Sequence, residues 1–332
     1  MSLAKQETSL EKHVDEKNNG TSTSGVLYDS AIILEGHTRS VNTSKFNQDG
    51  SLIATGGSNN SIQLWKLPTE NVNLNIASLN GHKRAVTSLC WLTDVLVSAS
   101  ADQSLGIWDT YTAQKLRKLV GHSSVINQVI GLNETSAASV ADDGKMMMWD
   151  YREKHNIASI ETGLPLLTAC CQRGKNNNTI YLSGINPQIV AFDIRNLKQE
   201  LWKFNSQLDT VTSLVTSPDG STLAMRTFDG LVRTYNINRD PSKPPSLGSV
   251  LLGTPSGDHY CSIKACFSNN NVKVLSGSED GTVIAWDHLS GSLLGKYQGH
   301  QDAVYEVDYH PKMDILLSCS ADGTAIVREL WQ

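Results

Sequence analysis

A segment of about 43 residues recurs seven times in this chain, and no other feature constrains the fold as strongly. Each copy ends a short apolar run with an anchor residue, which is aromatic in six of the seven copies. Successive anchors are separated by 43, 41, 43, 43, 51 and 42 residues. The anchors are Trp65, Trp108, Trp149, Phe192, Tyr235, Trp286 and Arg328. This regular period indicates seven copies of one structural unit.

Each unit contains the same series of short apolar runs separated by turn residues. A Gly-His dipeptide stands 26 to 29 residues ahead of the anchor in four units, and a strand-like run such as AVTSLCW or AVYEVDY follows it. Turns such as NQDG or SPDG then lead to a second run, because Asp-Gly favours tight hairpins. The anchor run and one further segment complete the unit. Four short strands in each of seven units predict an all-β, seven-bladed propeller.

The units resemble the WD40 family in their Gly-His dipeptides and in the Trp-Asp pairs at Trp108, Trp149 and Trp286. The resemblance covers residues 28–332, whereas residues 1–27 are polar and are expected to form a disordered tail. The last unit supplies three strands, and residues 30–36 (SAIILEG) supply an extra strand before the first unit. We therefore expect this N-terminal strand to complete the seventh blade and close the ring.

An Asp, a His and a hydroxyl recur in register with the anchors, which raises the question of a proton relay or a metal site. In WD40 proteins this set implies a structural network in which Asp bonds His, His bonds Ser or Thr, and the hydroxyl bonds Trp. Its repetition around a ring favours the structural role, because catalysis needs one copy, and histidines in different blades cannot share a metal. The expected network comprises His37, Thr55, His82, Ser98, Asp102, Trp108, His122, Ser139, Asp143, Trp149, Ser276, Asp280, Trp286, His300, Ser318 and Asp322.

Two consecutive units depart from this pattern. The fourth and fifth units lack Gly-His, and the fifth has Met225 in place of the hydroxyl and Tyr235 in place of the Trp. We expect these blades to be softer than the others or held by partners. The 51-residue step contains NRDPSKPPSLG, whose prolines cannot continue a central strand, so this insertion is expected to form a protruding loop.

Composition excludes several classes of function. The 332-residue chain carries a net charge of −5, so no broad basic surface for nucleic acid is expected. It contains no apolar run of about 20 residues and no secretory signal, which predicts an intracellular protein outside the membrane. The six cysteines contain no C-x-x-C pair, and no phosphate loop or nucleophile elbow is visible. We expect no enzymatic activity, catalytic residue, cofactor, metal or small-molecule substrate.

Candidate contact residues follow from the WD40 register. Around one mouth of the channel, side chains come from the start of each unit's first strand and from the position before the turn Asp. The first group comprises Asn42, Thr87, Asn127, Thr212 and Tyr305, and the second comprises Asp142, Phe228 and Glu279. For Phe228 and Tyr305, partner contact and packing between blades remain equally open. Arg39, Lys83 and Arg84 are either solvated loop residues or a small basic patch for an acidic segment or an RNA backbone.

The order of the irregular features carries a closer resemblance, to the WD40 subunit of the spliceosomal U5 small nuclear ribonucleoprotein. These features are the tail leading into AIILEGHTRSVN, the fourth unit after DDGKMMMWDYREKHNIASIETGLPLL, the segment VAFDIRNLKQELWKF and the insertion NINRDPSKPPSLGSVLLG. The resemblance implies a nuclear, non-catalytic scaffold of pre-mRNA splicing. It would bind the large scaffold protein and the GTPase of the U5 particle, with little direct RNA contact.

Two other functions remain open. Residues 149–152 (WDYR) resemble the W-D-x-R motif by which some propellers dock onto cullin-type ubiquitin ligases, which would make the chain a substrate receptor. Alternatively, Asp142 and Glu279 would hold a basic side chain in a chromatin or histone-peptide reader. Recovery of a cullin adaptor or of nucleosomes, without U5 RNA, would favour these functions over splicing.

Overall fold

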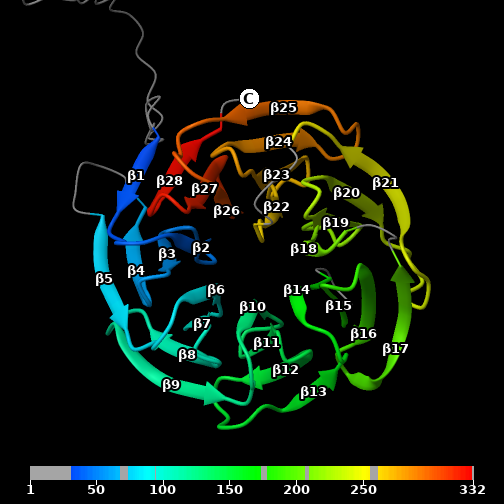
Figure 1. The fold of residues 1–332 in the computed structure, drawn as a ribbon, viewed down its shortest axis with the longest axis horizontal. Helices are drawn as coiled ribbons and strands as arrows, with labels where there is room; N and C mark the ends of the chain where they lie inside the picture. The colour runs from blue at the N-terminus through cyan, green and yellow to red at the C-terminus, as the bar shows by residue number, and fades with distance from the viewer. Residues whose placement is uncertain are drawn as a thin grey trace, which may run out of the picture.

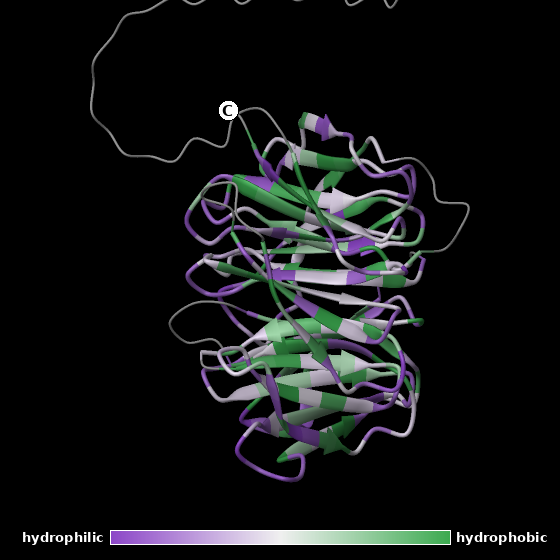
Figure 2. Cartoon of the chain, turned by 90° about the vertical axis from the view of Figure 1, so that its left-hand side faces the viewer, coloured by the Kyte–Doolittle hydropathy of each residue, from purple (hydrophilic) through white to green (hydrophobic). Residues whose placement is uncertain are grey.

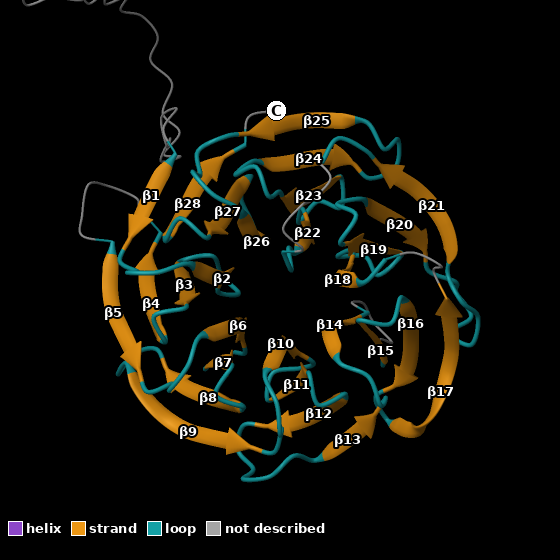
Figure 3. Cartoon of the chain, in the orientation of Figure 1, coloured by secondary structure: helices purple, strands orange, loops and turns teal. Residues whose placement is uncertain are grey.

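Seven four-stranded antiparallel sheets surround a central axis in the computed structural model of the chain (Figure 1). The structure describes residues 31–67, 74–93, 95–172, 178–205, 209–254 and 261–330. The expected tail, residues 1–27, lies outside the described residues. Every regular element in the described part is a strand (Figure 3), so the predicted all-β, seven-bladed propeller is confirmed.

Each blade consists of four strands in order from the axis outward. Blade 1 contains β2 (Val41–Phe46), β3 (Leu52–Gly57), β4 (Ser61–Lys66) and β5 (Asn75–Asn80). Blade 2 contains β6 (Val86–Trp91), β7 (Leu96–Ser100), β8 (Ser104–Asp109) and β9 (Gln114–Val120). Blade 3 contains β10 (Ile126–Gly131), β11 (Ser136–Ala141), β12 (Lys145–Asp150) and β13 (Ala158–Glu161). Blade 4 contains β14 (Leu166–Cys171), β15 (Thr179–Gly184), β16 (Gln188–Asp193) and β17 (Asn196–Asn205).

The remaining blades follow the same order, except at the outer edge of the last one. Blade 5 contains β18 (Val211–Thr216), β19 (Thr222–Thr227), β20 (Val232–Asn236) and β21 (Ser246–Leu251). Blade 6 contains β22 (Ala265–Phe267), β23 (Lys273–Gly277), β24 (Val283–Asp287) and β25 (Leu293–Tyr297). Blade 7 contains β26 (Val304–Tyr309), β27 (Ile315–Ser320), β28 (Thr324–Glu329) and β1 (Ile32–Glu35).

The burial pattern explains why these sequences stack as blades. The second strands, such as SAASVA in β11, are buried along all or nearly all of their length because neighbouring blades cover both faces. Their small and β-branched residues suit such a two-sided core. Outer strands, such as QKLRKLV in β9, expose most of their side chains to solvent. Viewed edge-on, the hydrophobic segments accordingly lie within the strands and many hydrophilic segments lie in the loops at the two faces (Figure 2).

The ring closes through β1, as predicted. This strand pairs antiparallel with β28, in a register from Ile32 opposite Val327 to Glu35 opposite Thr324. Leu34 is 1% exposed and packs in one core cluster with residues of blades 1 and 7. Burial of this side chain contributes about 1.5–3 kcal/mol. The first described strand thus covers the outer edge of the last blade.

A β-bulge interrupts the first strand of six blades, between its first and third residues. In blade 6, the described pairing of β22 shows no such shift. A bulge turns the extra residue out of the ladder. The six bulge residues are Asn42, Thr87, Asn127, Leu167, Thr212 and Tyr305.

A buried charge cluster joins blades 6, 7 and 1 near the axis. The Glu306 carboxylate lies 3.2 Å from Lys45 Nζ and 3.4 Å from Lys264 Nζ, and it accepts the Ser44 amide at 3.1 Å. Burial opposes its ionisation, but the two lysines outweigh that effect and lower the pKa of Glu306. Asp308 also lies 3.2 Å from Lys45 Nζ. This cluster holds the blades that meet where the ring closes.

Candidate functional site

Blade 2 contains a complete hydrogen-bonded network between its loop and its strands. His82 precedes β6, Ser98 lies in β7 and Trp108 lies in β8. His82 Nδ1 lies 3.0 Å from Asp102 Oδ2, and His82 Nε2 lies 2.7 Å from Ser98 Oγ. The Trp108 indole N–H donates to the same hydroxyl oxygen at 2.8 Å.

The protonation states in this network follow from its donors and acceptors. A carboxylate only accepts, so the His82 Nδ1–H donates to Asp102 and the Ser98 hydroxyl donates to Nε2. Burial lowers the pKa of His82 below 6.5, which favours this neutral imidazole. Burial opposes ionisation of Asp102, but hydrogen bonds from Ser104, the Lys83 amide and His82 outweigh it and hold the Asp102 pKa well below 3.8. Each polar group of the network has a hydrogen-bond partner, which is typical of a structural role that holds the loop to the strands.

Three other blades repeat the histidine part of this arrangement. In blade 3, His122 bonds Asp143 at 2.9 Å and Ser139 at 2.7 Å, and Trp149 donates to Ser139 at 2.8 Å. In blade 1, an amide replaces the carboxylate: His37 Nδ1 lies 2.9 Å from Asn59 Oδ1, and Nε2 lies 2.8 Å from Thr55 Oγ1. Trp65 donates to Thr55 at 2.9 Å.

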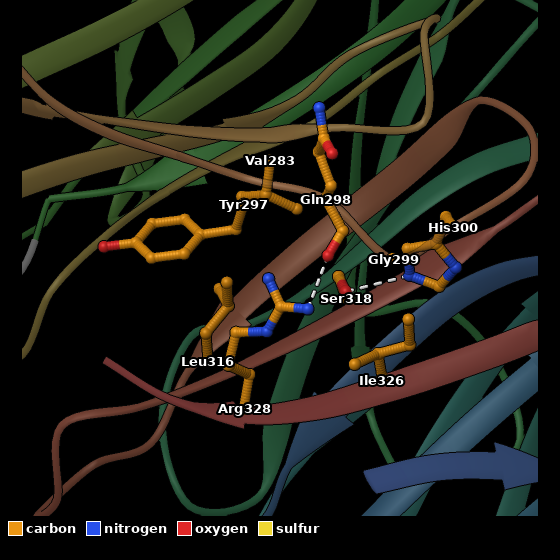
Figure 4. Close-up of a pocket in the computed structure, with 9 residues that line it drawn as sticks. All are labelled: Val283, Tyr297, Gln298, Gly299, His300, Leu316, Ser318, Ile326 and Arg328. Atoms are coloured by element: carbon orange, nitrogen blue, oxygen red, sulfur yellow. Dashed lines mark hydrogen bonds between the residues drawn. The ribbon is translucent and has the colours of Figure 1, made fainter. Parts of the chain in front are cut away.

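Blade 7 keeps the histidine but loses the indole. His300 bonds Asp322 at 3.0 Å and Ser318 at 2.9 Å. Arg328 stands in the Trp position, and its guanidinium donates to the Gln298 carbonyl instead of Ser318 (Figure 4). A cavity of about 10 Å³ remains between these residues, which is close to the space needed for one water molecule.

Blade 6 differs from the expected network. The Ser276 hydroxyl donates to the Gly277 carbonyl at 3.0 Å, and the Trp286 indole donates to the Leu252 carbonyl at 2.7 Å. Asp280 accepts the Thr282 amide and hydroxyl within its own turn. The three expected members therefore bond other groups instead of one another, because no described histidine links them.

Blade 5 replaces the histidine network with apolar packing and an arginine. Met225 and Tyr235 are buried in one cluster with residues of blade 4. Arg233, 8% exposed, lies 3.0 Å from Asp229 Oδ2 and donates to Thr227 Oγ1 at 2.9 Å. The turn Asp thus has a cationic partner from β20 in place of the neutral histidine of other blades. The Pro-rich insertion forms the exposed loop between β20 and β21.

The loops that lead into the inner strands, together with the turns between second and third strands, lie at one end of the blades, since all neighbouring strands are antiparallel. We call this end the histidine face. Among its bulge residues, four donate a side-chain hydrogen bond to a backbone carbonyl of the next blade. These residues, all candidate contact positions, are Asn42 (2.8 Å), Thr87 (2.5 Å), Asn127 (2.8 Å) and Thr212 (3.0 Å).

For one of these bulge residues, the prediction of partner contact is wrong. Thr212 is 0% exposed, so its side chain is inaccessible to a partner and instead joins blade 5 to the Ile263 carbonyl. Tyr305 and Phe228 are partly buried. Of the two acidic candidates, Asp142 is exposed and accepts Asn127 Nδ2 at 2.7 Å, while Glu279 accepts the Cys261 amide at 3.2 Å.

The three basic candidates lie exposed in the loops before β2 and β6. Among the described residues, Arg39, Lys83 and Arg84 form no ion pair, so their charges face solvent on neighbouring blades. The described ranges hold no group of three or more His, Cys, Asp or Glu side chains placed to bind a metal ion. They also hold no helix long and apolar enough to cross a membrane.

A larger cavity opens on the histidine face of blade 4, and sequence reasoning did not anticipate it. Its volume is about 200 Å³, and its walls include Leu164, Leu182, Asn186, Gln188, Val190 and Phe192. It lies in one of the three blades that lack Gly-His, between the loop before β14 and strands β15 to β17. The missing dipeptide is a signal that blade 4 shares with blades 5 and 6, so it could not have located the cavity alone.

Comparisons with known proteins agree with this geometry. A family model described as WD domain, G-beta repeat matches residues 251–287 and 291–328, and one described as DDB1- and CUL4-associated factor 12 beta propeller matches residues 27–117. The chain is 35% identical over 300 residues to pre-mRNA-splicing factor cwf17 of Schizosaccharomyces pombe, covering 89% of this chain and 86% of the relative.

Further relatives carry one shared name. The chain is 29% identical over 316 residues to the U5 small nuclear ribonucleoprotein 40 kDa protein of Dictyostelium discoideum, covering 94% of this chain and 87% of the relative. It is 29% identical over 301 residues to the protein of that name from Homo sapiens, covering 90% and 83%. The WD40 propeller and these full-length similarities lead to one conclusion: the chain belongs to the WD40-repeat family of cwf17 and the U5 small nuclear ribonucleoprotein 40 kDa protein.

Proposed function

We propose that this protein is a non-catalytic scaffold subunit of the spliceosome that acts in pre-mRNA splicing in the nucleus. The observation that carries the proposal is the similarity to cwf17 across 89% of the chain, since it includes the irregular blades 4 and 5 as well as the regular ones. The Asp-His-hydroxyl sets are internally hydrogen-bonded and hold the blades together. The surfaces of a closed disc therefore remain for binding other proteins.

The finer part of the proposal concerns partners. The resemblance favours the large scaffold protein and the GTPase of the U5 particle, with minor direct contact to RNA. Arg39, Lys83 and Arg84 support an acidic partner segment, because they add three uncompensated charges to adjacent loops of the histidine face.

Purification of the tagged protein from nuclear extract tests this function. We expect U5 small nuclear RNA and U5 proteins to be enriched over other nuclear RNAs and proteins. A triple variant, Arg39→Glu with Lys83→Glu and Arg84→Glu, should reduce that recovery. The matched control places the same charge change at the exposed rim, as Lys198→Glu with Arg239→Glu and Lys243→Glu. Recovery of a cullin adaptor or nucleosomes without U5 RNA would refute the splicing function.

A second candidate is a receptor for a cullin-type ubiquitin ligase, which the match of residues 27–117 to a DDB1- and CUL4-associated factor model favours. Arg152 of the WDYR segment exposes 63% of its side chain, and its guanidinium pairs with Asp150 at 2.6 Å. The histone-reader alternative relies on Asp142 and Glu279, which already accept hydrogen bonds from within the chain. Mass spectrometry of the purification above separates all three functions.

A further inference from the structure

The cavity of blade 4 occupies the place where other blades hold their histidine. Each network histidine stands four residues before the inner strand, as His37 does before Val41. The same register in blade 4 gives Thr162, four residues before Leu166. Its short side chain donates to the Gly144 carbonyl at 2.9 Å and cannot replace an imidazole. The space vacated by the ring is the cavity of about 200 Å³.

The cavity retains one polar feature of the lost network. Asn186 stands six residues before the blade 4 anchor, as Asn59 does in blade 1, where its side-chain oxygen lies 2.9 Å from the histidine Nδ1. Asn186 and the neighbouring Gln188 both line the cavity, and neither side-chain amide bonds another described residue. The side-chain oxygen of Asn186 can therefore accept a hydrogen bond from an N–H or O–H group of a bound molecule.

The two positions that hold the hydroxyl and the indole in other blades are apolar here, and Glu161, Glu200 and Lys203 also line the cavity. Leu182 replaces the hydroxyl of Thr55, and Phe192 replaces Trp65. A histidine in this space would bury its second ring nitrogen against Leu182 without a partner, which is unfavourable. An aromatic ring with a single donor would instead place that donor at Asn186 and its apolar part against Leu182, Val190 and Phe192.

The mouth and the volume fit the same kind of occupant. Leu164 lines the cavity and is 47% exposed, so an apolar group entering there covers it as well. An engineered protein cavity of about 150 Å³ takes up benzene, so a slightly larger space suits an indole or a phenol ring. Tryptophan and tyrosine are also the residues that most often anchor protein interfaces.

We propose that the blade 4 cavity binds one aromatic side chain that carries a single hydrogen-bond donor, a tryptophan or tyrosine presented by a partner polypeptide. The partner's ring takes the place that a histidine of the chain itself takes in blades 1, 2, 3 and 7. This inference does not depend on the splicing function. It describes a docking pocket for a partner that presents a tryptophan or a tyrosine.

Small probes of the full-length protein test the pocket directly. N-acetyl-tryptophanamide and N-acetyl-tyrosinamide are titrated at millimolar concentration while the methyl signals of leucine are followed by NMR. Saturable shifts are expected for at least one of these probes, with weaker binding of N-acetyl-leucinamide and N-acetyl-histidinamide. Asn186→Ala should lower the affinity for the aromatic probe about 2- to 10-fold, the usual effect of losing one hydrogen bond.

Variants locate the binding. Val190→Phe fills the cavity and should abolish the shifts, whereas Val250→Phe makes the same substitution at a 41% exposed site on β21 and should leave them unchanged. If Val190→Phe does not fold, Leu164→Ser at the exposed mouth serves as the test variant. It should bind the aromatic probe with a severalfold lower affinity. The proposal is overturned if neither aromatic probe saturates. It is also overturned if leucinamide binds as well, or if the folded cavity or mouth variant binds like the unaltered protein.

Discussion

Removing one hydroxyl from three different blades should have three different effects on stability. Ser98, Ser318 and Ser276 occupy equivalent positions in blades 2, 7 and 6, and each is at most 4% exposed. Their surroundings differ in the number of buried groups that depend on the hydroxyl. Replacing each serine by alanine therefore measures the network while burial and side-chain size stay matched.

The expected magnitudes follow from the groups left without a partner. Ser98→Ala deprives both the His82 Nε2 and the Trp108 indole N–H of their partner, at about 1–3 kcal/mol each, so we expect a loss of about 3 kcal/mol. Ser318→Ala deprives only His300, because Arg328 replaces the indole, and should cost about 1.5 kcal/mol. Ser276→Ala removes a bond to the adjacent Gly277 carbonyl and should cost less than about 1 kcal/mol.

Urea unfolding at pH 7.5, followed by tryptophan fluorescence and circular dichroism, gives the order of the three variants through their midpoints. The double variant Ser98→Ala with Trp108→Phe supplies a control, because it removes the indole donor together with its acceptor. The double variant should lose less unfolding free energy than the two single variants lose when their losses are added. Equal losses in all three blades, or the largest loss at Ser276, would refute the network as the origin of stability.

Three further predictions concern pH, closure and the charge cluster. Burial lowers the pKa of His37, His82, His122 and His300, so the unfolded chain takes up protons near pH 6.5 that the folded chain does not. Stability should therefore fall as the pH decreases from 7.5 to 5.5, and a melting temperature that stays constant would contradict this. Deleting residues 31–36 exposes the edge of β28 and should cause aggregation in size-exclusion chromatography, whereas a chain lacking residues 1–20 should elute as the unaltered protein does. Glu306→Ala leaves the buried Lys264 without its carboxylate, while Lys45 keeps Asp308, and should cost about 3 kcal/mol, with Glu161→Ala, at an exposed pair on β13, as the near-neutral control in the same urea assay.

The fold could be predicted because its information is repeated along the chain. A single anchor such as Trp108 is weak evidence, but seven anchors at nearly constant spacing fix the number of blades and the register of their strands. The closure by β1 followed from counting strands, and the pairing of Ile32 with Val327 confirms it. Both conclusions depend on local patterns, which a sequence displays directly.

Features that depend on contacts between blades could not be read in this way. Lys264 and Glu306 meet across the consecutive blades 6 and 7, and Lys45 of blade 1 joins them only because the ring closes. The bulge residues looked like free channel positions, yet Thr212 and its counterparts donate to the next blade, which requires knowledge of the bulge. The cavity of blade 4 arises because Thr162 does not fill the space of a histidine. The Gly-His dipeptide is also missing from blades 5 and 6, so its absence alone does not locate the cavity.

The pairing of β1 with β28 also determines when the propeller ring can close during synthesis. Val327, the partner of Ile32, is synthesised about 300 residues after it, which takes roughly 15–60 s at ordinary translation rates. Six blades can assemble during this interval, while the seventh lacks its outer strand. The nascent chain therefore carries β1 as an unpaired strand until β28 has been synthesised. Its yield in the cell should accordingly depend on chaperones that bind such strands during synthesis.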